Sequence, residues 1–227
     1  EGLKVEKMTL KNKSMATNAV SLITNTSFTV ESVDKKPTKR NPQPPFTTST
    51  LQQEASRKLG FNAKRTMSVA QALYEGKNIN GEATGLITYM RTDGVTIAGE
   101  ALAQCRDMIG KSYGDKFLPS SPRVYKSKAK NAQEAHEAIR PTSLFRKPED
   151  VTKALTDEEQ KLYTLIWKRT VASQMSEAIV EQTSAIIKSQ DHKVGLRASG
   201  SVMQFEGFLK LYKESHDDEN DDEDEKR

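Results

Sequence analysis

The chain has 227 residues, with 35 Lys and Arg against 31 Asp and Glu, which is a formal net charge of +4. Nine of the acids fall in residues 214–227, so residues 1–213 alone carry a net charge of +11. No apolar run approaches the roughly 20 residues that span a bilayer, and the single cysteine, Cys105, excludes a disulfide framework and a multi-cysteine zinc site. A body this basic favours a polyanionic partner, and nucleic acid is the first candidate. An ordinary protein rich in lysine has the same composition.

The first 33 residues alternate apolar and polar positions, as in Phe28 and Val30, and therefore predict strands. The chain begins at Glu1 inside this pattern, and we expect it to be a piece of a longer protein. Residues 35–45 read KKPTKRNPQPP. The four prolines forbid a helix and predict an extended basic connector.

Between residues 47 and 175 the apolar residues recur with helical period. Capping sequences open four of these segments, at Ser49 with Gln52, at Thr66, at Asn131 with Glu134 and at Thr156 with Glu159. Gly60, Gly76 and Pro141 end three of them. Trp167 and Cys105 fall on apolar stripes, so we expect both in the core. The predicted helices are 49–59, 66–75, 98–109, 131–140 and 156–175.

After residue 176 strand patterns return at 185–187, 194–198 and 202–212. The acidic stretch 214–227 is predicted to be disordered. This order of strands, helices and strands predicts an α+β fold of more than one domain. A mostly helical domain, 47–175, is inserted into a discontinuous, mostly antiparallel β domain, 1–46 and 176–227. The two crossings between them suit a hinge.

One candidate for chemistry is the segment 85–94, which reads GLITYMRTDG. If this segment is extended, the two-residue period puts Tyr89 and Arg91 on one face. A phenol beside a guanidinium can act as a nucleophile on a phosphodiester, because the guanidinium neutralises the phosphate oxygens and favours the phenolate. A strand with one surface aromatic and one surface charge has the same pattern.

A second candidate is the segment 133–142, which reads QEAHEAIRPT. On a helix His136 and Arg140 lie four residues apart and share a face. Together they can bind a phosphate, and the imidazole can also transfer a proton. The spacing alone does not separate this site from an ordinary surface histidine.

Several other polar residues could line a groove that binds the nucleic-acid backbone. Lys168 and Arg169 fall on the polar side of the predicted helix 156–175. Thr50, Gln53 and Arg65 belong to a cluster of hydroxyls, amides and cations near the starts of the first two predicted helices, although the same residues serve helix capping. Asp221, Glu223 and Glu225 alternate, but in a run without structure they form no fixed metal site. We predict no metal site in the chain.

Three motifs together, PFTTSTLQQ at 45–53, GLITYMRTDG at 85–94 and QEAHEAIRPT at 133–142, closely resemble bacterial type IA DNA topoisomerase I. They occur in the family's order, and the resemblance extends through residues 162–175 to cover nearly the whole chain. It implies a winged-helix-like (CAP-like) tyrosine domain within the arch of a toroidal enzyme, with the discontinuous β domain as the hinge.

The resemblance also implies roles for the candidate residues. Tyr89 is the nucleophile that forms a 5′-phosphotyrosine in single-stranded DNA, Arg91 positions the phosphate and His136 supports cleavage. Arg140 is a less specific match as a DNA contact. The implied activity is transient cleavage, strand passage and religation, which relaxes negatively supercoiled DNA in the cytoplasm, at the nucleoid.

The family's toprim domain supplies a glutamate acid and an Asp-x-Asp-x-Glu site for Mg²⁺, and this sequence contains neither. The DNA-entry domain and the C-terminal zinc modules are absent as well. We therefore expect the chain alone to be inactive, with Mg²⁺ as a cofactor of the full-length enzyme only. The expected partners are single-stranded or negatively supercoiled DNA and the missing domains of the same protein, with no membrane.

Two alternatives remain open. Tyrosine recombinases and type IB topoisomerases also combine Tyr, Arg and His, but their tyrosine follows the His and Arg motifs, whereas Tyr89 precedes His136. A non-catalytic single-stranded DNA-binding module would use only the basic surface.

Overall fold

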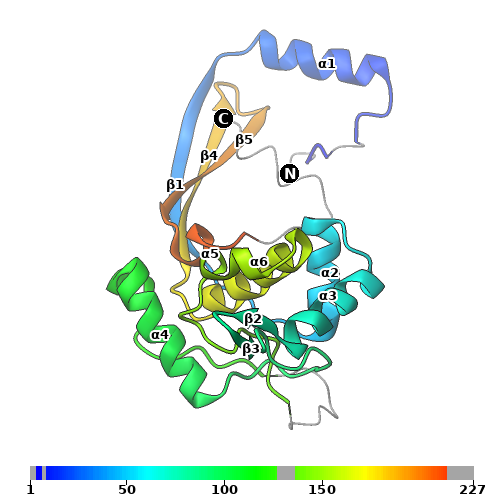
Figure 1. The fold of residues 1–227 in the computed structure, drawn as a ribbon. Coiled ribbons are helices and arrows are strands. Elements are labelled where there is room, and N and C mark those ends of the chain that lie inside the picture. Colours follow the sequence, from blue (N-terminus) through cyan, green and yellow to red (C-terminus); the bar gives the residue numbers. More distant parts are fainter. Residues whose placement is uncertain (1–3, 7–8, 127–135, 214–227) are drawn as a thin grey trace. The chain divides into compact units, whose positions relative to one another are not determined.

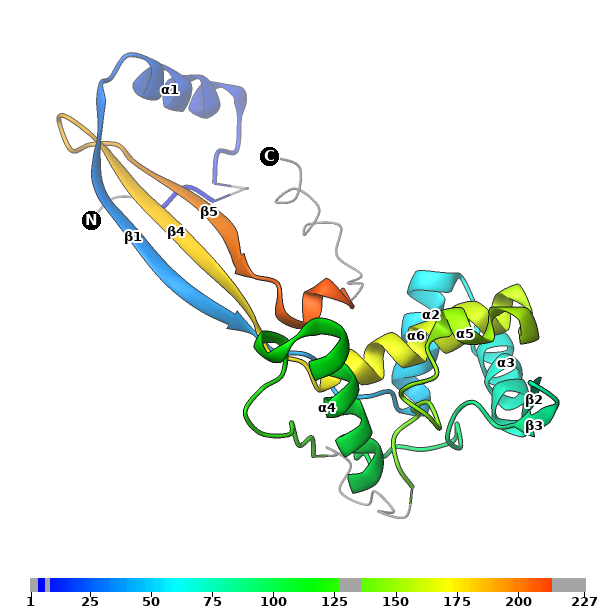
Figure 2. The ribbon, with the colours of Figure 1, turned by 60° about the vertical axis from the view of Figure 1, so that its left-hand side comes forward.

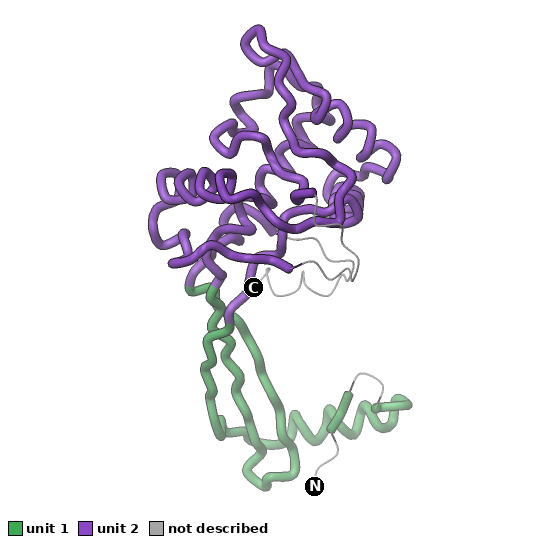
Figure 3. The backbone as a smooth tube through the Cα atoms, turned by 90° about the horizontal axis from the view of Figure 1, so that it is seen from below, with its two compact units in different colours: residues 1–38, 179–204, 223–227 green, residues 39–178, 205–222 purple. Residues whose placement is uncertain are grey.

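The computed structural model describes residues 4–6, 9–126 and 136–213, and Figure 1 shows their helices and strands. The described chain divides into two compact units (Figure 3). Among the described residues, unit 1 holds those up to Thr38 together with Ile179–Gln204, and unit 2 holds Lys39–Ala178 and 205–213. The predicted helix start at 131–134 and the predicted disordered stretch 214–227 lie outside the described residues.

Unit 1 is built on a three-stranded sheet with the order β1-β4-β5, and its long strands run side by side in Figure 2. The strands are β1 (Phe28–Arg40), β4 (Ala178–Ser189) and β5 (Gly195–Phe205). The sequence predicted strands in all three regions. Pro37 lies within β1, where the predicted connector begins, and the strand continues through it because β1 is an edge strand, on which a missing N–H is tolerated.

The prediction of strands throughout residues 1–33 is wrong at α1, a helix over Lys13–Thr24. Its start is fixed by Asn12, whose side-chain oxygen accepts a hydrogen bond from the N–H of Met15 at 2.9 Å. No residue of α1 is buried. The helix nevertheless carries an apolar stripe at helical spacing, Met15, Ala19, Leu22 and Ile23, so it was readable from the sequence and was missed.

Unit 2 contains the other helices around one hydrophobic core. Helices α2, α3 and α6 pack against one another, and α4 packs against the short helix η1. Leu51 of α2, Leu73 of α3 and Ile166 of α6 are fully buried at the centre. The helices of unit 2 are α2 (Thr48–Leu59), α3 (Ala63–Glu75), α4 (Gly99–Tyr113), η1 (Asp115–Phe117), α5 (Pro148–Val151), η2 (Thr152–Ala154), α6 (Asp157–Ser173) and η3 (Gly207–Lys210).

The predicted helix caps are found at some helix starts and not at others. Thr156 begins α6 with a reciprocal capping box to Glu159, as predicted. The box of α2 joins Thr47 to Thr50, two residues before the predicted cap at Ser49, and α3 is capped by Asn62 rather than by Thr66. Trp167 and Cys105 are buried as predicted, and burial raises the pKa of the Cys105 thiol to about 12.

A hairpin that the sequence analysis missed joins α3 to the segment of Tyr89. Strand β2 (Lys77–Ile79) pairs antiparallel with β3 (Glu82–Thr84). Asn80 and Gly81 form the turn, and both have positive φ. An Asn-Gly pair between short strands is a strong hairpin signal, so this element was readable from the sequence.

Two further predictions are corrected. Residues 136–140 are not helical, because their backbone groups bond to other segments instead of to one another. Residues 206–212 do not continue a strand: they form η3 and its flank, and Phe208 and Tyr212 are buried in the core of unit 2. Residues 205–213 therefore belong to the helical unit and not to the β domain, where the predicted division had placed them.

Within unit 2, a polar network joins the segments that lead to the ends of β1 and β4. The guanidinium of Arg123 donates to the carboxylate of Glu177 at 2.7 Å and to the carbonyl of Met175 at 2.8 Å. The ammonium of Lys39 donates to the other Glu177 oxygen at 2.8 Å. The hydrogen bond from Lys39, with the nearby charge of Arg123, lowers the pKa of Glu177 from 4.5 to about 2.

This network predicts an acid-dependent contribution to stability. Because the pKa of Glu177 is lower in the folded chain, its contribution is fully present above pH 4.5 and is lost as the pH falls toward 2. We expect Glu177→Gln to lower the free energy of unfolding by up to about 1 kcal/mol at pH 7, a typical size for a partly exposed ion pair. The difference from the wild type should shrink on acidification. Urea titrations at pH 7, 4 and 2.5 measure this difference.

Glu181→Gln, which removes an ion pair with Lys35, is the matched control. A difference that stays constant with pH would contradict the assignment.

Candidate active site

The site is built where residues 86–92 and 138–142 run against each other without forming long strands. The N–H of Thr88 donates to the carbonyl of Arg140 at 2.9 Å, and the N–H of Thr142 donates to the carbonyl of Leu86 at 3.0 Å. The Thr88 hydroxyl donates to the carbonyl of Ala138 at 2.8 Å. These bonds explain why two motifs about 50 positions apart in the sequence meet in unit 2.

Thr48, the first residue of α2, fixes the backbone on both sides of Arg91. Its hydroxyl donates to the carbonyl of Met90 at 2.8 Å and accepts from the N–H of Thr92 at 2.8 Å. Its own N–H donates to the carbonyl of Thr92 at 2.9 Å. The motif at 45–53 therefore fixes the backbone of the tyrosine motif through hydrogen bonds from the first residue of α2.

Gly94 permits the close approach of the His136 segment. A Cβ atom at this position would lie far inside van der Waals contact with the carbonyl oxygen of His136 and 3.1 Å from the hydroxyl of Thr92. Two residues further along each segment, the N–H of Ala138 donates to the carbonyl of Thr96 at 2.9 Å. Only glycine fits between the two backbones here.

Tyr89 lies at the surface, between two other rings. It is 39% exposed, and its ring centroid is 5.9 Å from that of His136 and 5.4 Å from that of Tyr74 on α3. The Tyr74 contact is edge-to-face, with an interplanar angle of 66°, which is a favourable geometry for an aromatic pair. The structure therefore brings Tyr89 and His136 together at an accessible position.

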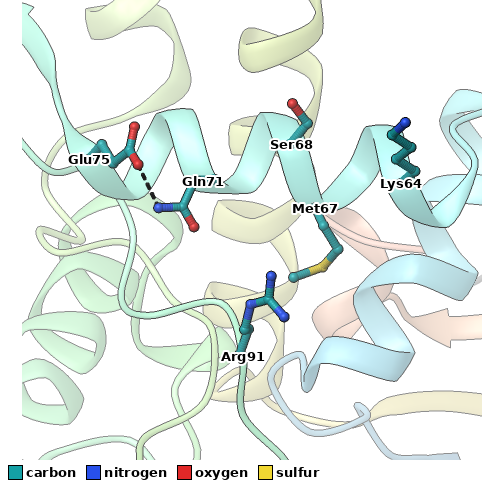
Figure 4. Close-up of a pocket in the computed structure, with 6 residues that line it drawn as sticks. All are labelled: Lys64, Met67, Ser68, Gln71, Glu75 and Arg91. Atoms are coloured by element: carbon teal, nitrogen blue, oxygen red, sulfur yellow. Dashed lines mark hydrogen bonds between the residues drawn. The ribbon is translucent and has the colours of Figure 1, made fainter.

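Arg91 is exposed like Tyr89, whereas Met90 and Thr92 are buried, so burial alternates from residue 89 to residue 92. The placement of the Tyr89 and Arg91 side chains on one face stays a prediction. Arg91 lines an open surface pocket of about 470 Å³. In Figure 4 it reaches toward Met67 of α3. The other lining residues all come from α3: Lys64, Ser68, Gln71 and Glu75.

Arg140 is engaged within the protein. Its Nε and Nη2 atoms donate to the two carboxylate oxygens of Glu137 at 2.7 and 3.1 Å, and Nη1 donates to the carbonyl of Pro141 at 2.9 Å. Its side chain is only 11% exposed. The hydrogen bond from Arg140 lowers the pKa of Glu137. The predicted helical face shared by His136 and Arg140 does not exist, and the role of Arg140 as a DNA contact stays a prediction.

Lys168 and Arg169 differ in their surroundings. Lys168 is exposed on α6, as predicted. Arg169 is 6% exposed, donates to the carbonyl of Pro44 at 2.7 Å and lies over the rings of Phe46 and Tyr212. The placement of Arg169 on the polar face of the helix is therefore wrong, because its guanidinium is held inside unit 2 by a carbonyl and two aromatic faces.

The three groove residues predicted on the first two helices differ in their surroundings. Thr50 is half-buried and used by the α2 capping box, since its hydroxyl accepts from the N–H of Thr47 at 2.9 Å. Gln53 is exposed on the same helix. Arg65 is exposed at the start of α3, where it pairs with Glu158 and stacks over Phe61.

Two residues to which the sequence analysis gave no role lie next to Tyr89 or His136. Tyr74 was readable as an aromatic residue on the polar side of a predicted helix, although its contact with Tyr89 was not. Glu137 lies inside the third motif, but the expectation of a helix there hid its contact with the N–H of Ala98, the residue before α4.

Among the described residues, no three His, Cys, Asp or Glu side chains come together in a way that could hold a metal ion. A metal site that needs three such side chains is thus not found in the part of the chain that the structure describes. Of the helices in that part, none has the length and apolar character needed to cross a membrane.

The chain is similar to known DNA topoisomerases. The sequence model of the DNA topoisomerase family matches residues 2–226. The chain is 53% identical over 220 residues to DNA topoisomerase 1 of Rickettsia bellii, covering 97% of this chain and 28% of that protein. It is 48% identical over 232 residues to DNA topoisomerase 1 of Xylella fastidiosa strain Temecula1, again over 28% of the relative's length.

The fold has a solved counterpart in full-length topoisomerase I from Thermotoga maritima. The TM-score is 0.79 at 34% sequence identity, over 94% of this chain and 34% of that one. The chain therefore belongs to the bacterial type IA DNA topoisomerase family. The relatives named here are topoisomerase I enzymes, and the chain spans about 28% of the length of the two curated ones.

Proposed function

We propose that this chain carries the nucleophile of a type IA DNA topoisomerase I, which breaks one DNA strand, passes another through the gap and reseals it. The observation that carries the proposal is an exposed tyrosine held beside an imidazole. Tyr89 is 39% exposed, and its ring lies 5.9 Å from that of His136.

In the proposed reaction the hydroxyl of Tyr89 loses its proton, and its oxygen attacks the phosphorus of a phosphodiester in single-stranded DNA. A bond forms between the tyrosine oxygen and phosphorus, and the bond from phosphorus to the 3′ oxygen breaks. The products are a 5′-phosphotyrosine and a free 3′-hydroxyl, whose proton comes from an acid outside this chain. Attack by that hydroxyl reverses the step and reseals the strand.

Arg91 is proposed to hold the phosphate. Its guanidinium can donate two hydrogen bonds to the non-bridging oxygens and offset their charge. Lys64 and Gln71 of α3 line the same pocket, together with Glu75, to whose carboxylate the Gln71 amide donates at 2.6 Å. A nucleotide next to the reacting phosphate could use Lys64 and the amide oxygen of Gln71 for contacts there.

His136 is proposed to support cleavage from the other side of Tyr89, where an imidazole can hold or transfer a proton. Lys168, Gln53 and Arg65 are exposed and remain proposed contacts to the DNA backbone. Thr50 and Arg169 are proposed to act indirectly, because one caps α2 and the other is buried against Phe46.

The two units are proposed to be the tyrosine domain and part of the β hinge of a toroidal enzyme, in which the hinge opens the arch for strand passage. Mg²⁺, the leaving-group acid and the DNA-entry surface would then be supplied by the toprim and DNA-entry parts of the full-length protein. Bound Mg²⁺ would supply positive charge near the phosphate. The proposed substrate is negatively supercoiled DNA in the bacterial cytoplasm.

The test is to identify the DNA end that becomes attached. Full-length protein is incubated with a single-stranded oligonucleotide labelled at the 5′ or the 3′ end and is then denatured. We expect the label to remain on the protein only when it lies on the fragment downstream of the break, as a 5′-phosphotyrosine requires. Attachment of the upstream fragment would indicate the type IB or recombinase alternative, and no attachment would indicate a binding module. The isolated chain is the negative control and should leave the linking number of supercoiled plasmid unchanged in Mg²⁺.

A further inference from the structure

The position of His136 requires an explanation, because regular secondary structure does not hold it. The segment that follows is fixed by backbone bonds, such as that from the N–H of Ile139 to the carbonyl of Phe46 at 2.8 Å. Ala138 is the residue nearest to His136 for which such a bond is described within this segment. The contacts described at residues 136 and 137 are those of the Glu137 side chain and the close approach of the His136 carbonyl to Gly94.

The side chain of Glu137 makes three contacts at this point. Its carboxylate receives two parallel N–H bonds from Arg140, at 2.7 and 3.1 Å, which is the strong bidentate form of this ion pair. One of its oxygens also accepts from the N–H of Ala98 at 2.9 Å. These contacts join residue 137 to residue 140 and to the start of α4.

The contact with Ala98 places the carboxylate at the N-terminus of a long helix. Ala98 is the residue before α4 and has no side-chain group with which to cap the helix. An acceptor at this end satisfies a free N–H, and a negative charge there is favoured by the helix dipole. Glu137 thus caps α4 from a segment 39 positions away.

Arg140 in turn leaves the carboxylate little freedom. Its guanidinium is largely buried, and Nη1 is bonded to the carbonyl of Pro141 at 2.9 Å. The ring of His136 leaves the backbone one residue before Glu137. Fixing the side chain of Glu137 at two points therefore restrains the backbone of residue 137, and with it the point from which the imidazole of the adjacent His136 extends.

We infer that Glu137 is a positioning residue, which acts through Arg140 and the start of α4 to hold the imidazole of His136 beside Tyr89. The inference deepens the proposed function and rests on it for its effect on DNA cleavage, although the geometry can be tested without DNA. The pair is a structural clamp, and Glu137 itself does not touch the reacting phosphate.

The first test uses NMR of the 227-residue chain, which has only three histidines. The His136 ring signals are expected to carry a ring-current shift from Tyr89. In Glu137→Gln, which keeps the side-chain shape but loses the charge and one acceptor, these signals should move toward those of a free imidazole. Arg140→Lys, which cannot form the parallel pair, should act in the same direction. The His192 signals should not move in either variant.

The second test measures single-turnover cleavage of a labelled oligonucleotide by the full-length protein. We expect Glu137→Gln to slow cleavage by about 10- to 100-fold, the scale of a misplaced reacting group, while the Kd for the oligonucleotide changes less than about twofold. Asp107→Asn is the matched control, because it removes an exposed ion pair with Lys111 on the same helix α4. It should leave both quantities unchanged.

The results of the two tests either support or contradict the positioning role of Glu137. A wild-type cleavage rate and unmoved His136 signals in Glu137→Gln would overturn it. Signals that move throughout unit 2, with a Kd that weakens in parallel with the rate, would also overturn it, because they indicate a general structural role. Failure of the proposed function is distinguishable, since it would appear as covalent attachment that persists in Tyr89→Phe.

Discussion

Replacing Tyr89 with Phe in the full-length protein is expected to abolish covalent attachment to DNA. The change removes the only atom that could bond to phosphorus in the proposed step and keeps the ring that packs between Tyr74 and His136. Because Tyr89 is exposed, the free energy of unfolding should change by less than about 0.5 kcal/mol. Oligonucleotide binding should persist. Denaturing gels with labelled single-stranded DNA, together with urea titrations, measure all three expectations.

Tyr74→Phe is the control for this experiment, because Tyr74 is a second exposed tyrosine whose ring contacts that of Tyr89. It should retain attachment and relaxation of supercoiled plasmid. If Tyr74→Phe loses the adduct while Tyr89→Phe keeps it, the nucleophile has been assigned to the wrong ring. If both variants keep the adduct, the chemistry lies elsewhere in the protein.

Replacing Gly94 with Ala should have the second largest effect, although residue 94 carries no functional group. The new methyl group would collide with the carbonyl oxygen of His136, so the two backbones must separate. We expect a loss of about 1–3 kcal/mol in the free energy of unfolding, as for other overpacked sites. Cleavage should fall at least about 10-fold, because the separation moves His136 away from Tyr89.

Gly99→Ala is the matched control, since a Cβ at Gly99 meets nothing within 4 Å. It lies in the first turn of α4, where alanine should leave stability unchanged or raise it by up to about 1 kcal/mol. Thermal unfolding and single-turnover cleavage of both variants test the pair. Equal behaviour of the two would show that the close approach at Gly94 does not hold the site together.

Much of the local structure was predictable because it depends on short-range chemistry. The capping box at Thr156 and Glu159 and the stop at Gly76 act within a few residues, and both predictions are confirmed. The alternation around Tyr89 was readable for the same reason, since burial of Met90 and Thr92 forces their neighbours outward.

The predictions that failed depended on distant partners. The segment after His136 was predicted to be helical because a capping sequence at 131–134 precedes it, but its N–H groups bond to Phe46, Thr88 and Thr96 instead. Arg169 was predicted to be a surface cation, but in the structure its guanidinium packs against the rings of Phe46 and Tyr212. The spacing of residues within one segment carries no information about contacts with distant segments.

The hydrogen bonds of Thr48 on either side of Arg91 have an energetic consequence for capturing a phosphate. Ordering a free backbone costs roughly 1–2 kcal/mol per residue at 25 °C. At residues 90–92 this cost is already met by folding, because one threonine at the start of α2 holds both flanking peptide groups. A phosphate that binds Arg91 therefore needs to restrict only the torsions of the Arg91 side chain. A larger part of the electrostatic attraction then contributes to the net free energy of binding the DNA strand.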